Sequence, residues 1–309
     1  MSHVSKKKGE PVRIRVLPSK IGNKVKRAQV MARIRQEKRR QKIEKKRARD
    51  ALGDAAPKPA PAKTLDNLRE FDDTMVAPGD EEVEGDEATD EFAAYFSGEK
   101  TPKIMITTAY HATAPTFRFI RDMLSFLPNA FYYKRGAYQL KDICKWAGNA
   151  GFTHLMVLAE KSKKLNGLYV SHLPEGPTAF FRMTTTMESA NIRGHGNPTS
   201  HTPEIILNNF NTRLGHRVGR LFGSLFPHRP EFIGRRVVTF HNQRDFIFIR
   251  HHRYIFNADG TRARLQEIGP RFTLKLRWLQ ATTFDTSEGE YEWVHKRKEM
   301  DTSRRRFHL

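Results

Sequence analysis

Short apolar runs alternate with helical patterns of apolar spacing from about residue 103 onward. The runs are rich in Ile, Val, Leu and Met, which is typical of buried strands. The helical segment repeats its apolar residues every three to four positions and stops at a proline. These patterns predict strands over 103–108, 155–158, 167–173 and 178–184, the last two joined by a Pro-Glu-Gly-Pro turn, and a helix over 116–127 that Pro128 ends.

A second set of elements follows in the same kind of order. The pattern predicts strands over 204–208, 236–240, 245–256 and 272–279, and a helix over 213–226 that ends at Pro227. In the last strand, strict alternation predicts a half-buried sheet with a basic outer face. The inner face would carry Phe272, Leu274, Leu276 and Trp278, and the outer face Thr273, Lys275 and Arg277.

Two local matches indicate an internal repeat. RFIRDMLSFLP (118–128) aligns with RVGRLFGSLFP (217–227) at an offset of 99 residues, and Gly-Pro precedes a strand at both 176–177 and 269–270. Chance remains an alternative for matches this short, but their order favours duplication. We therefore predict an α/β fold built from two similar strand–helix–strand halves.

Charge divides the 309-residue chain into three parts. The formal net charge of +21 arises from +16 over residues 1–49, −12 over 50–99 and +17 over 100–309. This distribution predicts a basic arm at 1–50, a Pro/Ala and acidic linker at 51–100, a folded body at 101–285 with halves of about 101–203 and 204–285, and a basic tail at 286–309. A net positive charge of this size indicates a polyanionic binding partner.

The arm over residues 24–49 consists of good helix formers without Pro or Gly, and charge dominates it. We expect it to contact RNA; a solvated helix and a nuclear-localisation patch are the other interpretations. The acidic segment 72–91 would be a mask for the basic body, a docking strip for a basic partner, or a solvated, disordered spacer, with the spacer slightly favoured. Aromatic residues at its end would attach it to the body.

Several function classes are disfavoured. No apolar run of about 18 residues is present, so we expect no membrane span, and the single cysteine, Cys144, allows no internal disulfide. His251 and His252 are neighbours in a predicted strand and would point to opposite faces, so they suit no shared metal ion. We expect no cofactor and no enzyme, because the carboxylates of the body are scattered over different elements, namely Asp122, Asp142, Glu204, Asp245 and Glu267.

RNA contact is the chemistry that remains. Arg213, His216 and Arg220 recur at helical spacing, and the segment 241–244 is a polar turn between strands whose alternative interpretation is an ordinary hairpin. Arg250 and Arg253 are interleaved with an aromatic residue, as in sites that stack unpaired bases. The full set of candidate RNA-binding residues is Lys38, Arg39, Arg40, Lys42, Lys45, Lys46, Arg47, Lys134, Arg135, Arg213, His216, Arg220, Gln243, Arg244, Arg250, Arg253, Arg271, Lys275, Arg304, Arg305 and Arg306.

Several of these segments resemble the Brix domain of ribosome-assembly factors. The resemblance covers residues 102–284 and rests on PKIMITT, SHLPEGPTAFF, PEIILNNFNTRLGHRVGRLFGSLFP, VVTFHNQRDFIFIRHHRYIF and EIGPRFTLKLRWLQ. The segment DEATDEFAAYF and the ending EYEWVHKRKEMDTSRRRFHL are similar to one branch of that family. This branch acts in early assembly of the large ribosomal subunit.

The resemblance implies a fold and a role. The fold would have two halves, each like an anticodon-binding domain. The protein would be a non-enzymatic nuclear and nucleolar factor bound to precursor rRNA of the large (60S) subunit, with a zinc-binding Mak-type assembly protein as heterodimer partner. Other pre-60S factors and ribosomal proteins would be its neighbours. Two alternatives stay open, namely a scaffold whose body binds only protein and a Brix factor of the small-subunit processome.

Overall fold

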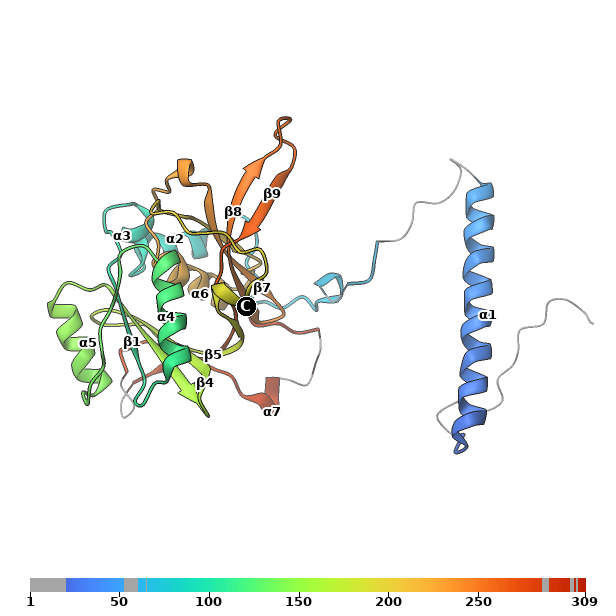
Figure 1. The fold of residues 1–309 in the computed structure, drawn as a ribbon, viewed down its shortest axis with the longest axis horizontal. Coiled ribbons are helices and arrows are strands. Elements are labelled where there is room, and N and C mark those ends of the chain that lie inside the picture. Colours follow the sequence, from blue (N-terminus) through green and yellow to red (C-terminus); the bar gives the residue numbers. More distant parts are fainter. Residues whose placement is uncertain (1–20, 53–60, 65, 285–288, 301–302, 304) are drawn as a thin grey trace, which may run out of the picture. The chain divides into compact units, whose positions relative to one another are not determined.

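The structure, a computed structural model, describes residues 21–52, 61–64, 66–284, 289–300, 303 and 305–309. It divides into two units, Met1–Ala62 and Lys63–Leu309 (Figure 1). None of the described helices is long and apolar enough to cross a membrane.

The first unit contains one long helix, α1 (Lys24–Ala51), where the sequence predicts a helix. The Asn23 side chain caps it by accepting hydrogen bonds from the amides of Val25 and Lys26 at 3.0 and 3.1 Å. No residue of α1 is buried, so its stability comes from helix propensity and the cap rather than from packing.

The second unit contains a sheet of eleven strands and several helices (Figure 1). The strands are β1 (Ile104–Thr108), β2 (Ala130–Tyr132), β3 (His154–Lys161), β4 (Lys164–His172), β5 (Thr178–Met187), β6 (Glu204–Asn208), β7 (Arg236–Gln243), β8 (Phe246–Phe256), β9 (Ala263–Glu267), β10 (Arg271–Gln280) and β11 (Tyr291–Val294). The α-helices are α2 (Glu81–Thr89), α3 (Ala93–Phe96), α4 (Ala114–Phe126), α5 (Leu140–Asn149), α6 (Arg213–Gly223) and α7 (Arg297–Met300), and the 3-10 turns are η3 (Asp66–Leu68), η4 (Ser189–Asn191) and η5 (Phe232–Gly234).

The strand order is β2-β1-β3-β4-β5-β10-β8-β7-β6, with β11 paired to β10 and β9 to β8. β1 runs parallel to β2 and β3, and β6 runs parallel to β7, while the remaining pairs are antiparallel. The outer part of β8 pairs with β9 alone and projects from the body as a two-stranded ribbon (Figure 1).

One face of the sheet packs against α4 and α6. Phe119 of α4 meets Phe272 of β10 edge to face, with ring centroids 5.4 Å apart, and Phe222 of α6 contacts Phe181 of β5 at 5.1 Å. Each helix therefore packs on a strand from the other part of the chain, and the buried residues form one continuous core. Burial of each such ring stabilises the fold by about 1.5–3 kcal/mol. On the opposite face, α5 packs its Ile143 and Ala147 against β1 and β3 in a smaller core.

Strand β10 departs from the alternation that the sequence predicts. Its pairing with β5 shifts register between Leu276 and Trp278, so Leu279 rather than Trp278 continues the core row. Trp278 instead lies on the opposite face, 5.7 Å from the ring of Phe180. A bulge sets two residues against one and sends the following side chains to the other face. The prediction for Trp278 is therefore wrong, and the other predicted core positions of the strand are buried: Phe272, Leu274 and Leu276.

Candidate nucleic-acid interface

Helix α1 presents positive charge around its whole circumference. Its sequence holds thirteen Lys and Arg against three acidic residues, and every residue of its C-terminal half, 38–51, is exposed. The only ion pair that the described part of this helix forms joins Arg40 to Glu37 at 3.3 Å. The arm residues predicted to bind RNA are thus open to solvent, namely Lys38, Arg39, Arg40, Lys42, Lys45, Lys46 and Arg47.

The predicted basic surface of α6 is covered by α2. Arg213 pairs with Glu82, and the Nδ1 atom of His216 lies 2.7 Å from a carboxylate oxygen of Glu87. The guanidinium of Arg213, by its hydrogen bond and its charge, lowers the pKa of Glu82. The sequence slightly favoured a solvated spacer for this segment, but the structure has a helix whose carboxylates pair with α6.

Arg220 makes the most enclosed of these contacts. Its Nε and Nη2 atoms each donate to a carboxylate oxygen of Asp90 at 2.6 Å, and Nη2 also donates to the carbonyl of Glu87 at 2.6 Å. Both side chains of the Arg220–Asp90 pair are only 13% exposed. The guanidinium lies 4.4 Å from the ring centroid of Phe96. A phosphate could reach this arginine only after the acidic segment moved.

Arg217 lies on a neighbouring side of α6. It pairs with Glu91 at 2.7 Å and with Glu292 at 3.0 Å. Its guanidinium also lies 5.5 Å from the ring of Phe92. These ion pairs raise the pKa of Arg217 despite its burial, which acts in the opposite direction.

The aromatic end of the acidic segment is part of the core. Phe92 and Tyr95 are fully buried, and the Tyr95 hydroxyl donates to Nε2 of His172 at 3.1 Å. His172 must then carry its proton on Nδ1, which donates to the carbonyl of Gly176 at 2.8 Å. Burial lowers the pKa of His172, which favours the neutral ring.

The first amides of α6 are occupied rather than free for an anion. Thr212 caps the helix by accepting from the amide of Gly215 at 2.9 Å, and its hydroxyl donates to the carbonyl of His308 at 2.7 Å. The amide of Arg213 donates to the carbonyl of Thr74 at 2.9 Å. The amides of Arg213 and Gly215 are therefore not available to a phosphate.

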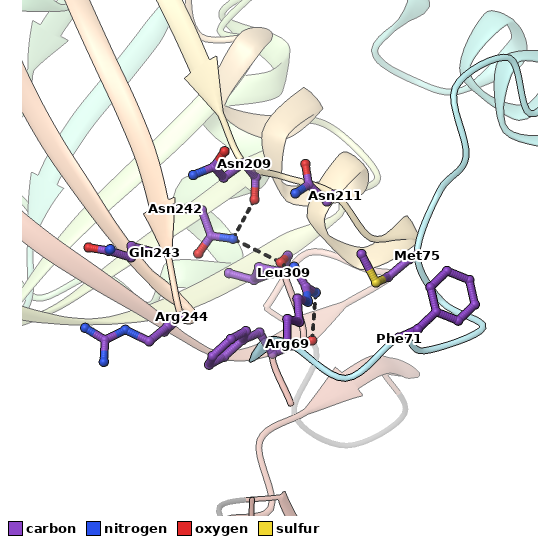
Figure 2. Close-up of a pocket in the computed structure, with 10 residues that line it drawn as sticks. Arg69, Phe71, Met75, Asn209, Asn211, Asn242, Gln243, Arg244 and Leu309 are labelled. Carbon is purple, nitrogen blue, oxygen red and sulfur yellow. Dashed lines mark hydrogen bonds between the residues drawn. The ribbon is translucent and has the colours of Figure 1, made fainter. Parts of the chain in front are cut away.

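The polar segment 241–244 forms the β7–β8 hairpin, and a cleft of about 300 Å³ opens beside it (Figure 2). Arg244 and Asp245 form the turn with positive φ values of 54° and 62°. Gln243 and Arg244 line one side of the cleft, and Arg244 is exposed. Asn209, Asn211 and Asn242 supply further polar groups, together with Arg69, Phe71, Met75, Phe307 and Leu309.

The end of the basic tail is held in this cleft. The Asn242 amide donates to the carbonyls of Asn209 at 2.8 Å and Leu309 at 3.0 Å, and Arg69 donates to Phe307 at 3.0 Å (Figure 2). Asp245 accepts hydrogen bonds from the amides of His308 and Leu309 at 2.7 and 2.9 Å. The Leu309 side chain is buried in the core.

The basic side chains of β8 and β10 differ in solvent exposure and in the partners they contact. Arg271 forms a two-point pair with Glu267, with distances of 2.9 and 2.5 Å, and lowers the pKa of that carboxylate. Arg250 is half-buried, and its guanidinium donates to the carbonyl of Ile249 at 2.8 Å. Arg253 is exposed on β8, at the base of the projecting ribbon, where the strand still pairs with β7. Lys275 lies 5.1 Å from the ring of Phe246.

The remaining candidate RNA-binding residues lie in the first half of the body and in the C-terminal tail. Lys134 is exposed, and Arg135 lies over the ring of Tyr110 at 3.7 Å. Arg305 is exposed, and Arg306 pairs with Glu70 at 3.4 Å. Arg304 lies outside the described residues.

The neighbouring histidines His251 and His252 lie on opposite faces of β8. His251 is buried, donates through Nδ1 to the carbonyl of Gly269 at 2.9 Å and accepts from Arg236 at 3.2 Å, while His252 points to the other face. Burial lowers the pKa of His251 to about 4. No group of three or more His, Cys, Asp or Glu among the described residues is arranged to hold a metal ion.

Sequence reasoning missed two features of this surface. One is the pairing of α2 and the residue after it with α6, in which Glu82, Glu87 and Asp90 pair with Arg213, His216 and Arg220. The other is the polar cleft, whose Arg69 and Asn209 are distant in sequence and carried no local signal.

Comparisons with known proteins agree with the resemblance found in the sequence. The Brix domain family model matches residues 110–278. "Ribosome production factor 1" of Pongo abelii is 53% identical over 297 residues, which cover 94% of this chain and 84% of the relative. The protein of that name from Saccharomyces cerevisiae is 42% identical, with 94% and 97% covered. A solved "probable ribosomal biogenesis protein from Aeropyrum pernix K1" is 15% identical with a TM-score of 0.43, over 56% of this chain and 96% of that one.

Proposed function

The chain belongs to the Brix domain family and to its ribosome production factor 1 group, and from this membership we propose that it is a non-enzymatic assembly factor that binds precursor rRNA of the large ribosomal subunit in the nucleolus. Ribosome biogenesis follows from the names of its relatives. Binding to precursor rRNA, action on the large subunit and location in the nucleolus are what we propose beyond that.

Helix α1 is the observation that carries RNA binding. At a rise of about 1.5 Å per residue, its 28 residues extend about 42 Å. It has no buried residue and only a weak apolar stripe, so it lacks the face with which a helix docks into a protein groove. A long cation of this shape suits a phosphate backbone, where each neutralised phosphate releases counterions.

The carboxylates of the body support a non-catalytic role. Asp122 accepts from the amide of Ser189 at 2.6 Å, and Glu204 accepts from the Tyr254 hydroxyl. Asp245 holds the tail and Glu267 pairs with Arg271, so four of the five scattered carboxylates have structural partners.

RNA binding by α6 requires that α2 give way, and α2 would then act as the mask considered from the sequence. Replacing the exposed Glu82 and the partly exposed Glu87 with Gln removes two of its charges. If α6 contributes to binding, these changes raise RNA affinity and steepen its salt dependence. Unchanged affinity would restrict α6 to a structural role.

In-cell crosslinking with mapping of the crosslinked nucleotides tests the function. Clusters in large-subunit precursor rRNA, reached from both α1 and the body, are expected. Crosslinks from α1 alone would favour the scaffold whose body contacts only protein, and sites in small-subunit precursor RNA would refute the large-subunit assignment. The control is a variant with residues 45–47 changed to Gln, which should lose crosslinks at α1 while keeping those of the body.

We also propose the heterodimer with a zinc-binding Mak-type protein that the family resemblance implies, in a particle with other pre-60S factors and ribosomal proteins. Purification of the chain through a tag after a stringent salt wash should retain one zinc-binding protein in a 1:1 ratio. Loss of that protein while rRNA remains bound would refute a dedicated partner.

A duplicated body with two anticodon-binding-like halves is a further part of the proposal. The order β1-β3-β4-β5 and the order β6-β7-β8-β10 have the same pattern of parallel and antiparallel pairs, and they meet at β5 and β10. In each half a buried histidine donates to the glycine carbonyl of a Gly-Pro pair, His172 to Gly176 and His251 to Gly269. An experimental structure whose halves fail to superpose over these strands and over α4 and α6 would refute it.

A further inference from the structure

Five large aromatic side chains near β2 and α5 are about half exposed, although such rings usually bury most of their area. They lie within 37 residues of sequence, on β2, on α5 and in the loops beside them. We call them the aromatic surface: Tyr110 (48% exposed), Phe131 (46%), Tyr133 (50%), Tyr138 (58%) and Trp146 (51%).

One group of these rings is held in place by specific contacts. Tyr138 meets Trp146 edge to face, with centroids 5.1 Å apart and an angle of 86°. The Tyr110 hydroxyl donates to the Tyr138 carbonyl at 3.0 Å, and Arg135 donates to the same carbonyl at 3.2 Å. Arg135 also stacks on the Tyr110 ring at 3.7 Å. The rings are therefore fixed while much of their area faces solvent.

The second group lies at β2, an edge strand that among the described strands pairs with β1 alone; Phe131 is on the strand and Tyr133 directly follows it. Phe131 and Tyr133 are two residues apart and both contact Phe152, with centroids 6.2 and 5.7 Å away. They thus share one face, as alternation along a strand requires. The ammonium of Lys103 lies 4.4 Å from the Phe152 ring.

Basic residues are interleaved with these rings. Residues 130–149 hold four Lys and Arg against one Asp, a net charge of +3. Lys134, Lys141 and Lys145 are all exposed. The core of a protein–protein interface is depleted in lysine, whereas single-stranded nucleic acids are bound by aromatic rings set among cations.

We propose that the aromatic surface stacks unpaired RNA bases while Lys134 and Lys145 contact the flanking phosphates. This inference rests on the proposed function and specifies the form of RNA that the body reads. Unpaired bases are required because the faces of paired bases are already stacked on their neighbours. Helix α1, by contrast, offers only charge and binds either form.

The test uses the full chain and two fluorescent RNAs, a 12-nucleotide oligouridine and a 12-base-pair duplex, in anisotropy titrations over a series of salt concentrations. Trp146→Ala and Tyr138→Ala should each weaken oligouridine binding at least about 5-fold, the lower end expected for loss of one stacked base. Duplex affinity and the salt slope should stay unchanged. Trp146→Phe keeps a ring and should recover most of the affinity, whereas Lys134→Ala should lower the salt slope.

Phe232→Ala is the matched control, because Phe232 is 64% exposed on η5, outside the aromatic surface. It should leave the affinities for both RNAs unchanged. Unfolding curves of all variants should coincide with that of the native chain, since the replaced rings are half exposed.

The outcomes separate this inference from the proposed function. Suppose that Trp146→Ala and Tyr138→Ala bind oligouridine within twofold of the native chain, while neutral replacements in α1 weaken oligouridine binding. The aromatic surface is then not a base-stacking site, and the proposed RNA binding stands. If those variants keep full RNA affinity but lose crosslinks to a protein neighbour in the particle, the surface docks protein and the inference is overturned. If the native chain binds neither RNA, the proposed RNA binding fails and the inference fails with it.

Discussion

Arg220→Ala should destabilise the folded body strongly. Arg220 and Asp90 are both 13% exposed and joined by two hydrogen bonds of 2.6 Å. Removing one partner of a largely buried pair costs about 3–5 kcal/mol, because the other charge is left buried without compensation. The loss of the hydrogen bond to Glu87 and of the contact with Phe96 acts in the same direction.

Urea unfolding followed by circular dichroism measures this loss. For a body of this size, with a slope of about 3 kcal/mol per M, a loss of about 3 kcal/mol lowers the midpoint by about 1 M. A double-mutant cycle with Asp90→Ala separates the pair from the other contacts, and we expect a coupling energy of at least about 2 kcal/mol. The double variant should be more stable than the sum of the single losses predicts, since it buries no unpaired charge.

Arg213→Ala is the matched control on the same helix. The Arg213–Glu82 pair is largely exposed, and solvent screens such pairs, so the midpoint should not change measurably. A coupling energy below about 0.5 kcal/mol for Arg220 and Asp90 would show that they do not interact across the two segments. That result would refute the conclusion that the acidic segment covers α6.

Three further predictions concern RNA binding, backbone geometry and pH. Changing residues 45–47 of α1 to Gln should reduce the slope of log K against log salt by about 0.7–0.9 per lost phosphate contact, and an unchanged slope would exclude this part of α1 from the interface. Gly176→Ala should lower the thermal midpoint by several degrees, because Gly176 has a φ of 123° and an added Cβ would overlap the carbonyl oxygen of Ala281; an unchanged midpoint would contradict this geometry. The pKa of His251 is lowered to about 4 from an ordinary value of 6.5, so the unfolded chain takes up its proton first, and stability present above pH 6.5 should fall by about 3 kcal/mol as the pH drops towards 4. His251→Asn, which keeps a donor for Gly269, should flatten that dependence in unfolding curves, and an equally steep curve would show that other groups cause it.

Local patterns predicted much of the secondary structure. The strand at 204–208 has the predicted bounds, and β10 extends one residue beyond the predicted 272–279 at each end. β2, α5, β9 and β11 were missed, because they are short or carry many polar residues. Trp278 was placed on the wrong face because a bulge depends on the partner strand, which alternation within one strand does not reveal.

The sequence by itself determined the basic arm, the α/β class and the candidate cations, because charge, helix propensity and apolar period are properties of neighbouring residues. The tertiary structure alone decided which cations face solvent. Arg220 and Arg253 look alike in sequence, yet one is enclosed by Asp90 and the other is exposed on β8. The aromatic surface also needed the fold, since exposure of a ring is set by what packs on it. The ion pairs between α2 and α6 join residues distant along the chain, and their energies depend on distance and burial that only the folded chain fixes.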